Sequence, residues 1–213
     1  MRFNSDQIQK IGKEISSKVD GKTLFDEFSR GRYSTDASVY QIKPLGVVLP
    51  KDTNDVLSLM EYSQKNSVPL LARGGGSSQC GQTVGESVVL DYSKHQNKIL
   101  ELNVEEKYVW VQPGVVLDHL NDYLKPHGLW FPVDVSTSSR ATIGGMSANN
   151  SCGSRSLYYG NMVHNVLAIE AILDDGSIFN FDQINKNYLA TKNNQDRLYK
   201  IIDKFIDVRQ KVG

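Results

Sequence analysis

Three consecutive glycines are the first residues in this chain whose spacing suggests chemistry. They lie in the segment Arg73–Gly81, which reads RGGGSSQCG. Glycine has no Cβ atom, so this backbone can adopt positive φ angles and approach a ligand closely. Successive N–H groups in such a loop can form an anion-binding nest, to which Ser77 and Ser78 would add hydroxyl donors. The segment therefore predicts a diphosphate site, where Arg73 adds charge or holds the loop by hydrogen bonds.

This first loop matches neither of the common nucleotide-binding motifs. A P-loop ends in Lys followed by Ser or Thr, and this loop contains no Lys. A dinucleotide fingerprint counted from Gly74 requires glycine at position 79, where the chain has Gln79. A mobile glycine turn between two strands would have the same composition. The glycines alone therefore do not decide the ligand.

A second long segment, residues 132–165, is also rich in Gly, Ser, Thr and Asn. Long ordered loops inside a domain are uncommon and are usually functional. Thr142–Gly145 is predicted to form a small-residue turn, after which Met146–Asn149 opens a helix whose free N–H groups face an anion. The polar residues that follow, up to Gly153, suit a polyol chain or a ring edge. The alternative is an Ω-loop that packs only on itself.

Cysteine and histidine are scarce in this chain. Cys80 and Cys152 form no CxxC pair, and no histidine lies near them at zinc-ligand spacing. We therefore expect no metal site and two reduced thiols, with a disulfide between them left open. The histidines are expected to be surface or packing residues rather than catalytic bases: His95, His119, His127 and His164.

Hydrophobic periodicity indicates the elements that position the two loops. Residues 1–30 are predicted to form one or two polar helices, with Ile8, Ile11 and Ile15 on one face. The next elements form a β-α-β unit, which favours a parallel strand pair. They are a strand at 46–49, a helix capped by Thr53 with Val56, Leu57, Met60 and Tyr62 inward, and strands at 68–72 and 88–90.

The second half of the chain is predicted to alternate short strands with helices. The predicted elements are strands at 98–102 and 107–112, a helix over 115–126 with Leu117, Leu120 and Leu124 inward, a buried strand at 167–173, a hairpin turn at 174–176, a return strand at 177–181, and a helix from about 195 with Leu198, Ile201, Ile202 and Phe205 as its apolar stripe.

Composition excludes several classes of protein. The 213 residues carry 24 basic and 24 acidic side chains, so no basic stripe indicates nucleic acid or an anionic membrane as a partner. The N-terminus lacks a signal-peptide pattern, and no apolar run approaches the roughly 20 residues that span a bilayer. We expect a soluble, cytoplasmic protein that is not membrane-spanning.

Four segments, taken in order, resemble a known family. They read RGGGSSQCGQTVG, VQPGVVLDHLNDYLKPHGLWFP, STSSRATIGGMSANNSCGSRSLYYG and VLAIEAILDDG. They resemble the FAD-binding domain of D-lactate dehydrogenases and glycolate oxidase subunits, which has the fold of p-cresol methylhydroxylase and vanillyl-alcohol oxidase. The resemblance is greatest to long bacterial proteins that fuse this domain to an iron–sulfur domain, including D-2-hydroxyglutarate dehydrogenases. It covers about residues 30–180, and RYSTDASVYQIKPLGVVLP belongs to it.

The resemblance implies an α+β fold in which two lobes hold FAD between them. After an N-terminal helical segment (1–30), the FAD-binding domain would span 31–213, with lobe one at about 31–95 and lobe two at about 96–213. The first loop would wrap the pyrophosphate and the second would line the ribityl and flavin side. The implied cofactor-binding residues are Arg73, Gly74, Gly75, Gly76, Ser77, Ser78, Gly81, Gln82, Pro132, Thr142, Gly144, Gly145, Asn149, Gly153, Tyr159, Gly160 and Val166.

The resemblance also bears on how FAD is attached. Some members of the family attach it covalently through a histidine in the first loop, and Ser77 occupies that place here. Others carry a cysteinyl attachment in the second loop, where this chain has Cys152. With no histidine nearby, we expect non-covalent FAD and disfavour linkage to Cys152.

The chemistry implied is oxidation of a 2-hydroxy acid by hydride transfer to flavin N5 after a base removes the hydroxyl proton. In the family, the carboxylate-binding arginine and the catalytic histidines lie in a C-terminal cap domain, and electrons leave through an iron–sulfur domain or another acceptor. Two isolated cysteines cannot hold a [4Fe–4S] cluster, which normally takes about four. We therefore expect an excised domain or truncated product that lacks the cap and iron–sulfur domains, with its catalytic residues unknown.

Three other interpretations compete. An NADPH-dependent reductase of a UDP-sugar uses the same FAD fold, but TIGGMSANNSCG fits the hydroxy-acid branch better. A non-catalytic flavin-binding module would also lack the cap. A phosphate-binding protein without flavin is disfavoured, because the second loop would then have no purpose.

Overall fold

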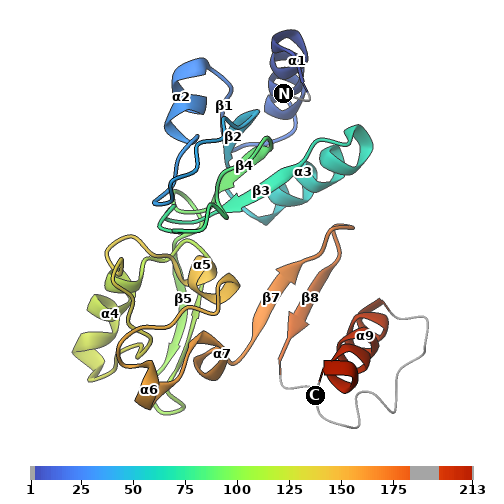
Figure 1. Cartoon of the computed structure of the whole chain (residues 1–213). Coiled ribbons are helices and arrows are strands. Elements are labelled where there is room, and N and C mark those ends of the chain that lie inside the picture. The colour runs from blue at the N-terminus through green and yellow to red at the C-terminus, as the bar shows by residue number, and fades with distance from the viewer. Residues whose placement is uncertain (1–2, 183–196, 213) are drawn as a thin grey trace. The chain divides into compact units, whose positions relative to one another are not determined.

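The computed structural model describes residues 3–182 and 197–212. It comprises two compact units, the first containing Met1–Val166 with Ile172–Ile178 and the second Leu167–Ala171 with Phe179–Gly213. The first unit contains both glycine-rich loops. Figure 1 shows the course of the chain.

The N-terminal part of the first unit begins with helix α1 (Ser5–Ser16). Asn4 caps it, because its side chain accepts a hydrogen bond from Gln7 N (2.9 Å) while Gln7 Oε1 accepts one from Asn4 N (2.8 Å). Ile8, Ile11 and Ile15 are buried, which confirms the predicted face.

The rest of the segment predicted as helix contains strand β1 (Lys22–Leu24) before helix α2 (Glu27–Arg32), so the prediction missed a strand. A strand of this length has no periodicity to reveal it. Its partners are distant in sequence: Lys22 pairs antiparallel with Leu49. The buried Asp55 carboxylate fixes the preceding turn by accepting from the backbone N–H groups of Asp20 (2.8 Å) and Gly21 (2.9 Å).

The main sheet is built from β1, β2 (Gly46–Leu49), β3 (Leu70–Arg73) and β4 (Val88–Asp91), in the order β1-β2-β4-β3. β2 and β3 are both parallel to β4, as the β-α-β pattern predicts, but they are not neighbours. The fully buried β4 lies between them, because Val88 pairs with both Gly46 and Leu70. The loop between β3 and β4 therefore leaves from the carboxyl end of an edge strand.

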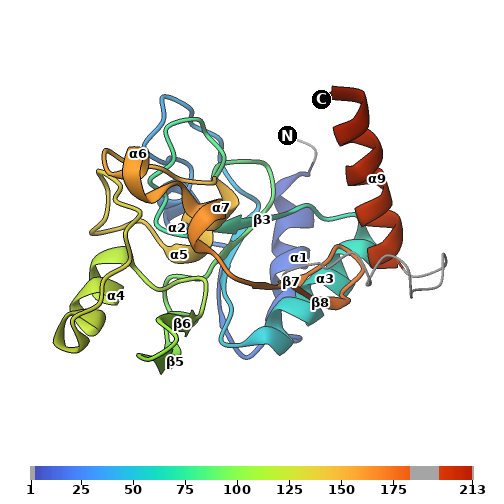
Figure 2. The same cartoon turned by 90° about the horizontal axis from the view of Figure 1, so that it is seen from below.

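Helix α3 (Thr53–Asn66) connects β2 to β3 and differs from the prediction at its start. Asp52, not Thr53, is the N-cap, since its side chain accepts from Asn54 N (2.9 Å) and Asp55 N (3.2 Å). Val56 and Tyr62 are buried as expected, and Met60 packs partly against the same core. Leu59, rather than the predicted Leu57, completes the buried face. Figure 2 shows α3 beside α1, which it meets through the Tyr62 hydroxyl and Glu14 Oε2 (2.7 Å).

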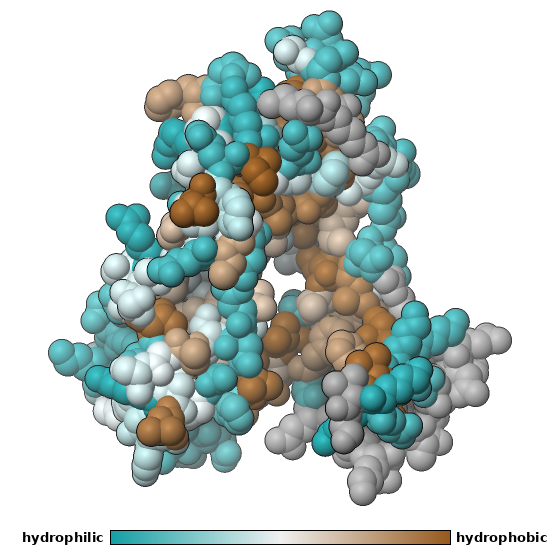
Figure 3. Space-filling model, in the orientation of Figure 1, coloured by the Kyte–Doolittle hydropathy of each residue, from teal (hydrophilic) through white to brown (hydrophobic). Residues whose placement is uncertain are grey.

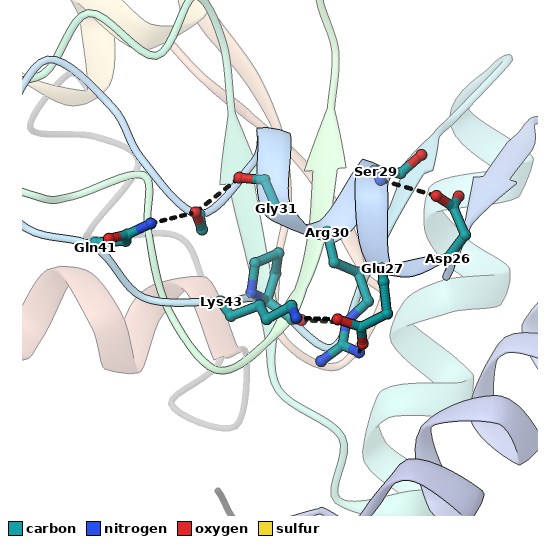
Figure 4. A network of polar contacts seen from close by, with 9 residues as sticks. Asp26, Glu27, Ser29, Arg30, Gly31, Gln41 and Lys43 are labelled. Carbon is teal, nitrogen blue, oxygen red and sulfur yellow. Dashed lines mark hydrogen bonds and ion pairs between the residues drawn. The ribbon is translucent and has the colours of Figure 1, made fainter.

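A polar network fixes the segment that leads into β2 (Figure 4). The Arg30 guanidinium is buried; its Nε donates to the carbonyl oxygen of Pro44 (2.8 Å) and its NH1 to Glu27 Oε1 (2.6 Å). Lys43 forms an ion pair with the same carboxylate, and its hydrogen bond holds the pKa of Glu27 below the usual value. The strand-leading segment is thereby tied to α2.

A second hydrophobic core lies beyond residue 98. The antiparallel pair β5 (Ile99–Asn103) and β6 (Tyr108–Val111) precedes α4 (Leu117–Leu124) and the single turn η1 (Lys125–His127). Leu117, Leu120 and Leu124 are buried, which confirms the predicted stripe. Three short helices follow: α5 (Ile143–Ala148), α6 (Ser156–Tyr159) and α7 (Met162–Asn165).

Replacing Leu120 with alanine should lower the free energy of unfolding by about 2–5 kcal/mol, because it leaves a cavity in this core. Leu120 is 1% exposed. Leu100→Ala is the matched control: Leu100 is 60% exposed and should cost less than about 0.5 kcal/mol. Urea unfolding of both variants measures the difference. Equal losses of stability would contradict this description of the core.

The chain then forms the hairpin of β7 (Ile169–Ile172) and β8 (Ile178–Phe181). Its turn contains Gly176 at φ +82°, as the Asp-Asp-Gly sequence predicts. The prediction of a buried strand here is wrong, since Leu167 and Ile169 are 64% and 45% exposed. A two-stranded ribbon gives each strand only one neighbour, so an apolar run does not guarantee burial.

The last helix, α9 (Arg197–Val212), confirms the helix predicted from about 195. Ile202 is buried, but Phe205 is 72% exposed, so the predicted stripe is wrong at Phe205. Periodicity predicts an amphipathic helix without showing what covers its apolar face. The side chain of Leu198 lies outside the described residues.

Candidate cofactor-binding site

The first loop, residues 74–87, connects β3 to β4 without regular structure. Gly76 and Gly81 have φ angles of +64° and +74°, which L side chains rarely adopt. The backbone N–H groups from Gly74 to Ser78 donate to no acceptor among the residues that the structure describes. These consecutive N–H groups are therefore available to an anion, as the sequence predicts.

The two loops contact each other directly. A Cβ atom added at Gly74 would lie closer than 3.0 Å to Thr142 Oγ1, and one at Gly75 would lie equally close to the carbonyl oxygen of Arg140. Gln82 forms a further bridge: its Nε2 donates to Asn149 Oδ1 (2.9 Å), and its Oε1 accepts from the Ser78 hydroxyl. Glycine at 74 and 75 thus permits close packing of the first loop on the second.

Arg73 fixes the start of the first loop through hydrogen bonds of its guanidinium group. Its NH1 donates to the carbonyl oxygens of Tyr33 (3.3 Å) and Thr83 (3.2 Å), and its NH2 donates to that of Thr35 (2.9 Å). The guanidinium also lies 5.2 Å from the centroid of the Tyr33 ring. Burial lowers the pKa of Arg73 and, with the hydrogen bond to Asp91, raises that of Tyr33 to about 12. Of the two roles left open by the sequence, these contacts support the structural one.

The segment Tyr33–Tyr40, here called the bracing segment, contacts the first loop at several positions. Ala37 N donates to the Gly76 carbonyl oxygen (3.1 Å), and Thr83 Oγ1 donates to Asp36 Oδ2 (3.0 Å). Burial alone would raise the pKa of Asp36, but hydrogen bonds from Ser38 and Thr83 lower it. The ring of Tyr40 lies against Gly81.

Sequence reasoning missed the bracing segment as part of the site. The sequence contains one local indication of its shape: Asp36 is followed two residues later by Ser38, whose N–H donates to Asp36 Oδ1 (2.8 Å). This is an Asx-turn pattern. Its long-range partners, Gly76 and Thr83, have no counterpart in the local sequence.

The helix expected in the second loop is α5, but it begins earlier than predicted. Thr142 is its N-cap, and Met146–Ala148 forms its C-terminal half rather than its start. The first N–H groups are already engaged: Ile143 N donates to Val115 O (2.8 Å) and Gly144 N to Pro113 O (2.9 Å). The expectation of free N–H groups at a helix start is therefore wrong here. A Cβ at Gly144 would lie 2.5 Å from Pro113 Cβ, so glycine is needed there for packing.

The remaining predicted residues form a second group, whose contacts run to residues 130–134 and His164 instead of the first loop. Gly153 lies against the backbone of Asp134, and Tyr159 makes an edge contact with Trp130 at 5.2 Å between centroids. Gly160, at φ +78°, faces the ring of His164. Val166 packs against the second core, and Pro132 lines a pocket of about 290 Å³ with Trp130 and Asn165.

Asp134, which sequence reasoning did not select, links the segments of this second group. Its Oδ2 accepts from the Ser154 hydroxyl (2.7 Å) and its Oδ1 from the backbone N–H of Arg155 (3.0 Å). These hydrogen bonds, that of Ser154 first, lower the pKa of the Asp134 carboxyl.

The cysteines and histidines have no evident catalytic arrangement within the described residues. Cys80 and Cys152 are free and exposed, so the structure has no disulfide between them. His164 Nδ1 accepts from Asn161 N (3.1 Å), and the His127 ring lies 6.1 Å from the Tyr123 ring, measured between centroids. Residues 3–182 and 197–212 contain no cluster of metal-ligating side chains. No helix in those ranges is long and apolar enough to cross a membrane.

Comparison with known proteins agrees with this geometry. Residues 44–182 match the family model described as FAD binding domain. The chain is 42% identical over 155 residues to D-2-hydroxyglutarate dehydrogenase of Haemophilus influenzae, which covers 71% of this chain and 15% of that protein. It is 35% identical over 175 residues to glycolate oxidase subunit GlcD of Bacillus subtilis, covering 80% of this chain and 37% of that one. The chain thus spans only a small part of these relatives.

The fold has close counterparts among solved structures. The structure of p-cresol methylhydroxylase with substrate bound superposes with a TM-score of 0.68 at 19% identity, covering 83% of this chain and 36% of that one. This likeness confirms the predicted α+β fold of the p-cresol methylhydroxylase type. Because the family model matches residues 44–182, more than half of the chain, the chain belongs to the FAD-binding domain family, whose cofactor is FAD.

Proposed function

We propose that this chain is the FAD-binding part of an enzyme that oxidises a D-2-hydroxy acid of the lactate, glycolate or 2-hydroxyglutarate class. The observation that carries the proposal is the run of N–H groups from Gly74 to Ser78, which have no acceptor among the described residues and lie against the second loop. The choice of substrate class rests on similarity to relatives named D-2-hydroxyglutarate dehydrogenase, glycolate oxidase subunit and D-lactate dehydrogenase.

The first loop would hold the pyrophosphate through its backbone. The N–H groups of Gly74–Ser78 can donate to phosphate oxygens, and the Ser77 hydroxyl can add a further donor. Gln82 and Asn149, which bridge the loops, would close one side of the site. Arg73 supports the loop, because its guanidinium is used by three backbone carbonyls.

The second loop would receive the ribityl and flavin side. Pro132, Gly153, Tyr159 and Gly160 supply this surface in our proposal, and Thr142, Gly144 and Gly145 position it by packing. Val166 follows this loop directly in the sequence. FAD would be bound without a covalent link. Some members of the family bond FAD to a histidine in the first loop, and this chain has Ser77 at that place, whose side chain contains no ring nitrogen.

We place lobe one at about residues 31–95 and lobe two at about 96–213, after the N-terminal segment 1–30. Two separate buried clusters support a division near residue 95: one contains α1, α3 and the main sheet, and the other contains α4 and α5. The two loops contact each other at Gly74 and Gly75, which lie against Thr142 and Arg140.

When bound, FAD supplies the electron acceptor for oxidation of a hydroxy acid. In this proposal the chain's own residues bind and orient that cofactor. The groups that bind the substrate carboxylate and remove its proton would come from a cap domain outside these residues. Electrons would pass to an iron–sulfur domain or another acceptor, and the enzyme would be cytoplasmic.

The first test is the visible absorption spectrum of the chain after mixing with FAD and gel filtration. Flavin absorption should co-elute with the protein, because the free N–H groups can bind the pyrophosphate. Acid precipitation should release all of the flavin into solution, since the attachment is non-covalent. Flavin that remains on the precipitate would contradict non-covalent binding, and absence of flavin from the protein peak would contradict the proposal.

The second step tests the substrate class. A form of the enzyme that carries the proposed cap domain should lose its flavin absorption under anaerobic conditions with D-2-hydroxyglutarate, D-lactate or glycolate. NADPH should leave the absorption unchanged. Bleaching by NADPH, with no response to any hydroxy acid, would instead identify a reductase.

A further inference from the structure

Residues 130–160, which overlap the second loop, contain two arms that are distant in sequence and lie together in space. The first arm is Trp130–Val135 and the second is Gly153–Gly160. Asp134 joins them: its Oδ2 accepts from the Ser154 hydroxyl at 2.7 Å, and its Oδ1 accepts from Arg155 N at 3.0 Å. A Cβ at Gly153 would also clash with the Asp134 backbone. The arms are therefore in contact through both the side chain and the main chain of one residue.

The second arm has no buried face to hold it against a core. Its helix α6 has no buried residue and no side-chain cap, and Leu157 and Tyr158 are 101% and 85% exposed. Figure 3 shows apolar side chains in this part of the molecule as separate brown groups among hydrophilic ones. A segment without a buried face gains its position from specific contacts rather than from a core.

The end of the second arm also contacts α7, where Asn165 Nδ2 donates to the Tyr159 carbonyl oxygen (2.9 Å) and His164 lies against Gly160. The remaining side-chain contacts run to the first arm. The Arg155 guanidinium lies 5.1 Å from the Trp130 ring centroid, and Tyr159 meets that ring edge-on at 5.2 Å. These ring contacts are weak and exposed, and they persist when one arm shifts slightly along the other. The two hydrogen bonds to Asp134 are directional and charge-assisted, so they determine the register of the arms.

We propose that Asp134 is a positioning residue that sets the spacing of the two arms and thereby shapes the surface that receives the flavin end of FAD. This inference rests on the proposed function, in which Pro132 belongs to the first arm and Gly153, Tyr159 and Gly160 belong to the second. Asp134 acts through these residues and does not itself bind the cofactor.

Two substitutions separate the hydrogen bonds from the charge. Asp134→Ala removes both acceptors. In Asp134→Asn the side-chain oxygen can still accept from Arg155 N. The side-chain NH2 group can donate to the Ser154 hydroxyl oxygen. Both hydrogen bonds then lack the negative charge. Charge-assisted bonds are stronger than neutral ones. The alanine variant should therefore be affected more than the asparagine variant.

The experiment measures the FAD dissociation constant of each variant by quenching of flavin fluorescence, with the visible circular dichroism of bound flavin as a second readout. Asp134→Ala should raise the dissociation constant by about tenfold or more, the loss expected for a charge-assisted bond. Asp134→Asn should restore part of that loss. Bound flavin in the alanine variant should have an altered circular dichroism spectrum, because its surroundings have moved.

Asp122→Ala on α4 is the matched control, since it removes an exposed carboxylate from the same part of the chain. It should leave both the dissociation constant and the spectrum unchanged. The melting temperature of each variant without FAD should equal that of the control, because the arms contribute little to the core. Should Asp134→Ala fail to fold, Ser154→Ala decides: it removes one of the two bonds and should raise the dissociation constant by a smaller factor.

The outcomes distinguish the inference from the function it rests on. If the unchanged chain binds FAD and Asp134→Ala binds it equally well with the same spectrum, the inference is overturned and the proposed function stands. If Asp134→Ala does not fold, an unchanged FAD dissociation constant in Ser154→Ala likewise overturns the inference and leaves the proposed function standing. If the unchanged chain does not bind FAD, the proposed function and the inference fall together.

Discussion

Gly75→Val is expected to abolish FAD binding by this chain. From the sequence, glycine is required there so that the backbone can approach a pyrophosphate. The structure adds a second and stronger requirement: any Cβ at this position would lie within 3.0 Å of the carbonyl oxygen of Arg140. The atoms that this Cβ would meet are backbone atoms of Arg140, so rotation of a side chain cannot relieve the clash. Valine adds a branch at Cβ and would force the loops apart.

The FAD dissociation constant of Gly75→Val should rise by roughly 100-fold or more, since the run of N–H donors is displaced as a unit. Gly85→Ala is the matched control from the same loop. Its nearest neighbour would be Leu71 Cδ2 at 3.5 Å, an ordinary contact, so FAD binding should be retained. Stoichiometric FAD on Gly75→Val after gel filtration would show that the first loop does not contact the cofactor.

Arg73→Met should both destabilise the protein and weaken FAD binding. Methionine retains the apolar part of the side chain but leaves the carbonyl oxygens of Tyr33, Thr35 and Thr83 without their donor. Hydrogen bonds from charged groups contribute about 1.5–3 kcal/mol each, and part of this is recovered by water at a half-buried site. We expect a loss of about 3 kcal/mol in the free energy of unfolding and at least about a tenfold rise in the FAD dissociation constant.

Urea unfolding and fluorescence titration of the same preparations measure these two effects. Arg32→Met is the control, because it removes an exposed positive charge from α2 and should cost less than about 0.5 kcal/mol. Arg73→Lys should recover only part of the loss, since one ammonium group cannot reach three carbonyls in the geometry of a guanidinium. Weakened FAD binding with unchanged stability would mean instead that Arg73 contacts a phosphate directly.

The local sequence pattern was sufficient to predict the helices that bury one face against a core. Ile8, Ile11 and Ile15 recur at helical spacing and are buried, and so are Leu117, Leu120 and Leu124. A helix of this kind needs only a neighbouring surface, so its own sequence reveals its inward face. The family resemblance was carried by four segments, which include the two loops, and comparison with known proteins confirms the family and the fold.

Pattern was insufficient wherever a partner distant in sequence determines the structure. The strand Lys22–Leu24 forms because Leu49 offers an edge, and β4 takes the centre of the sheet because both β2 and β3 pair with it. The apolar strand Ile169–Ile172 is partly exposed because its sheet has only two strands. None of these partners is visible within a window of neighbouring residues.

The candidate site shows the same division. By itself, the sequence determined that Gly74–Ser78 could present backbone donors, because that property belongs to residues without side chains or with short polar ones. Only the tertiary structure decided which donors remain free. The N–H groups from Gly74 to Ser78 have no acceptor among the described residues, whereas Ile143 N and Gly144 N donate to the carbonyl oxygens of Val115 and Pro113. A backbone N–H is the same group in every residue, so its availability depends on which carbonyl the fold brings to it.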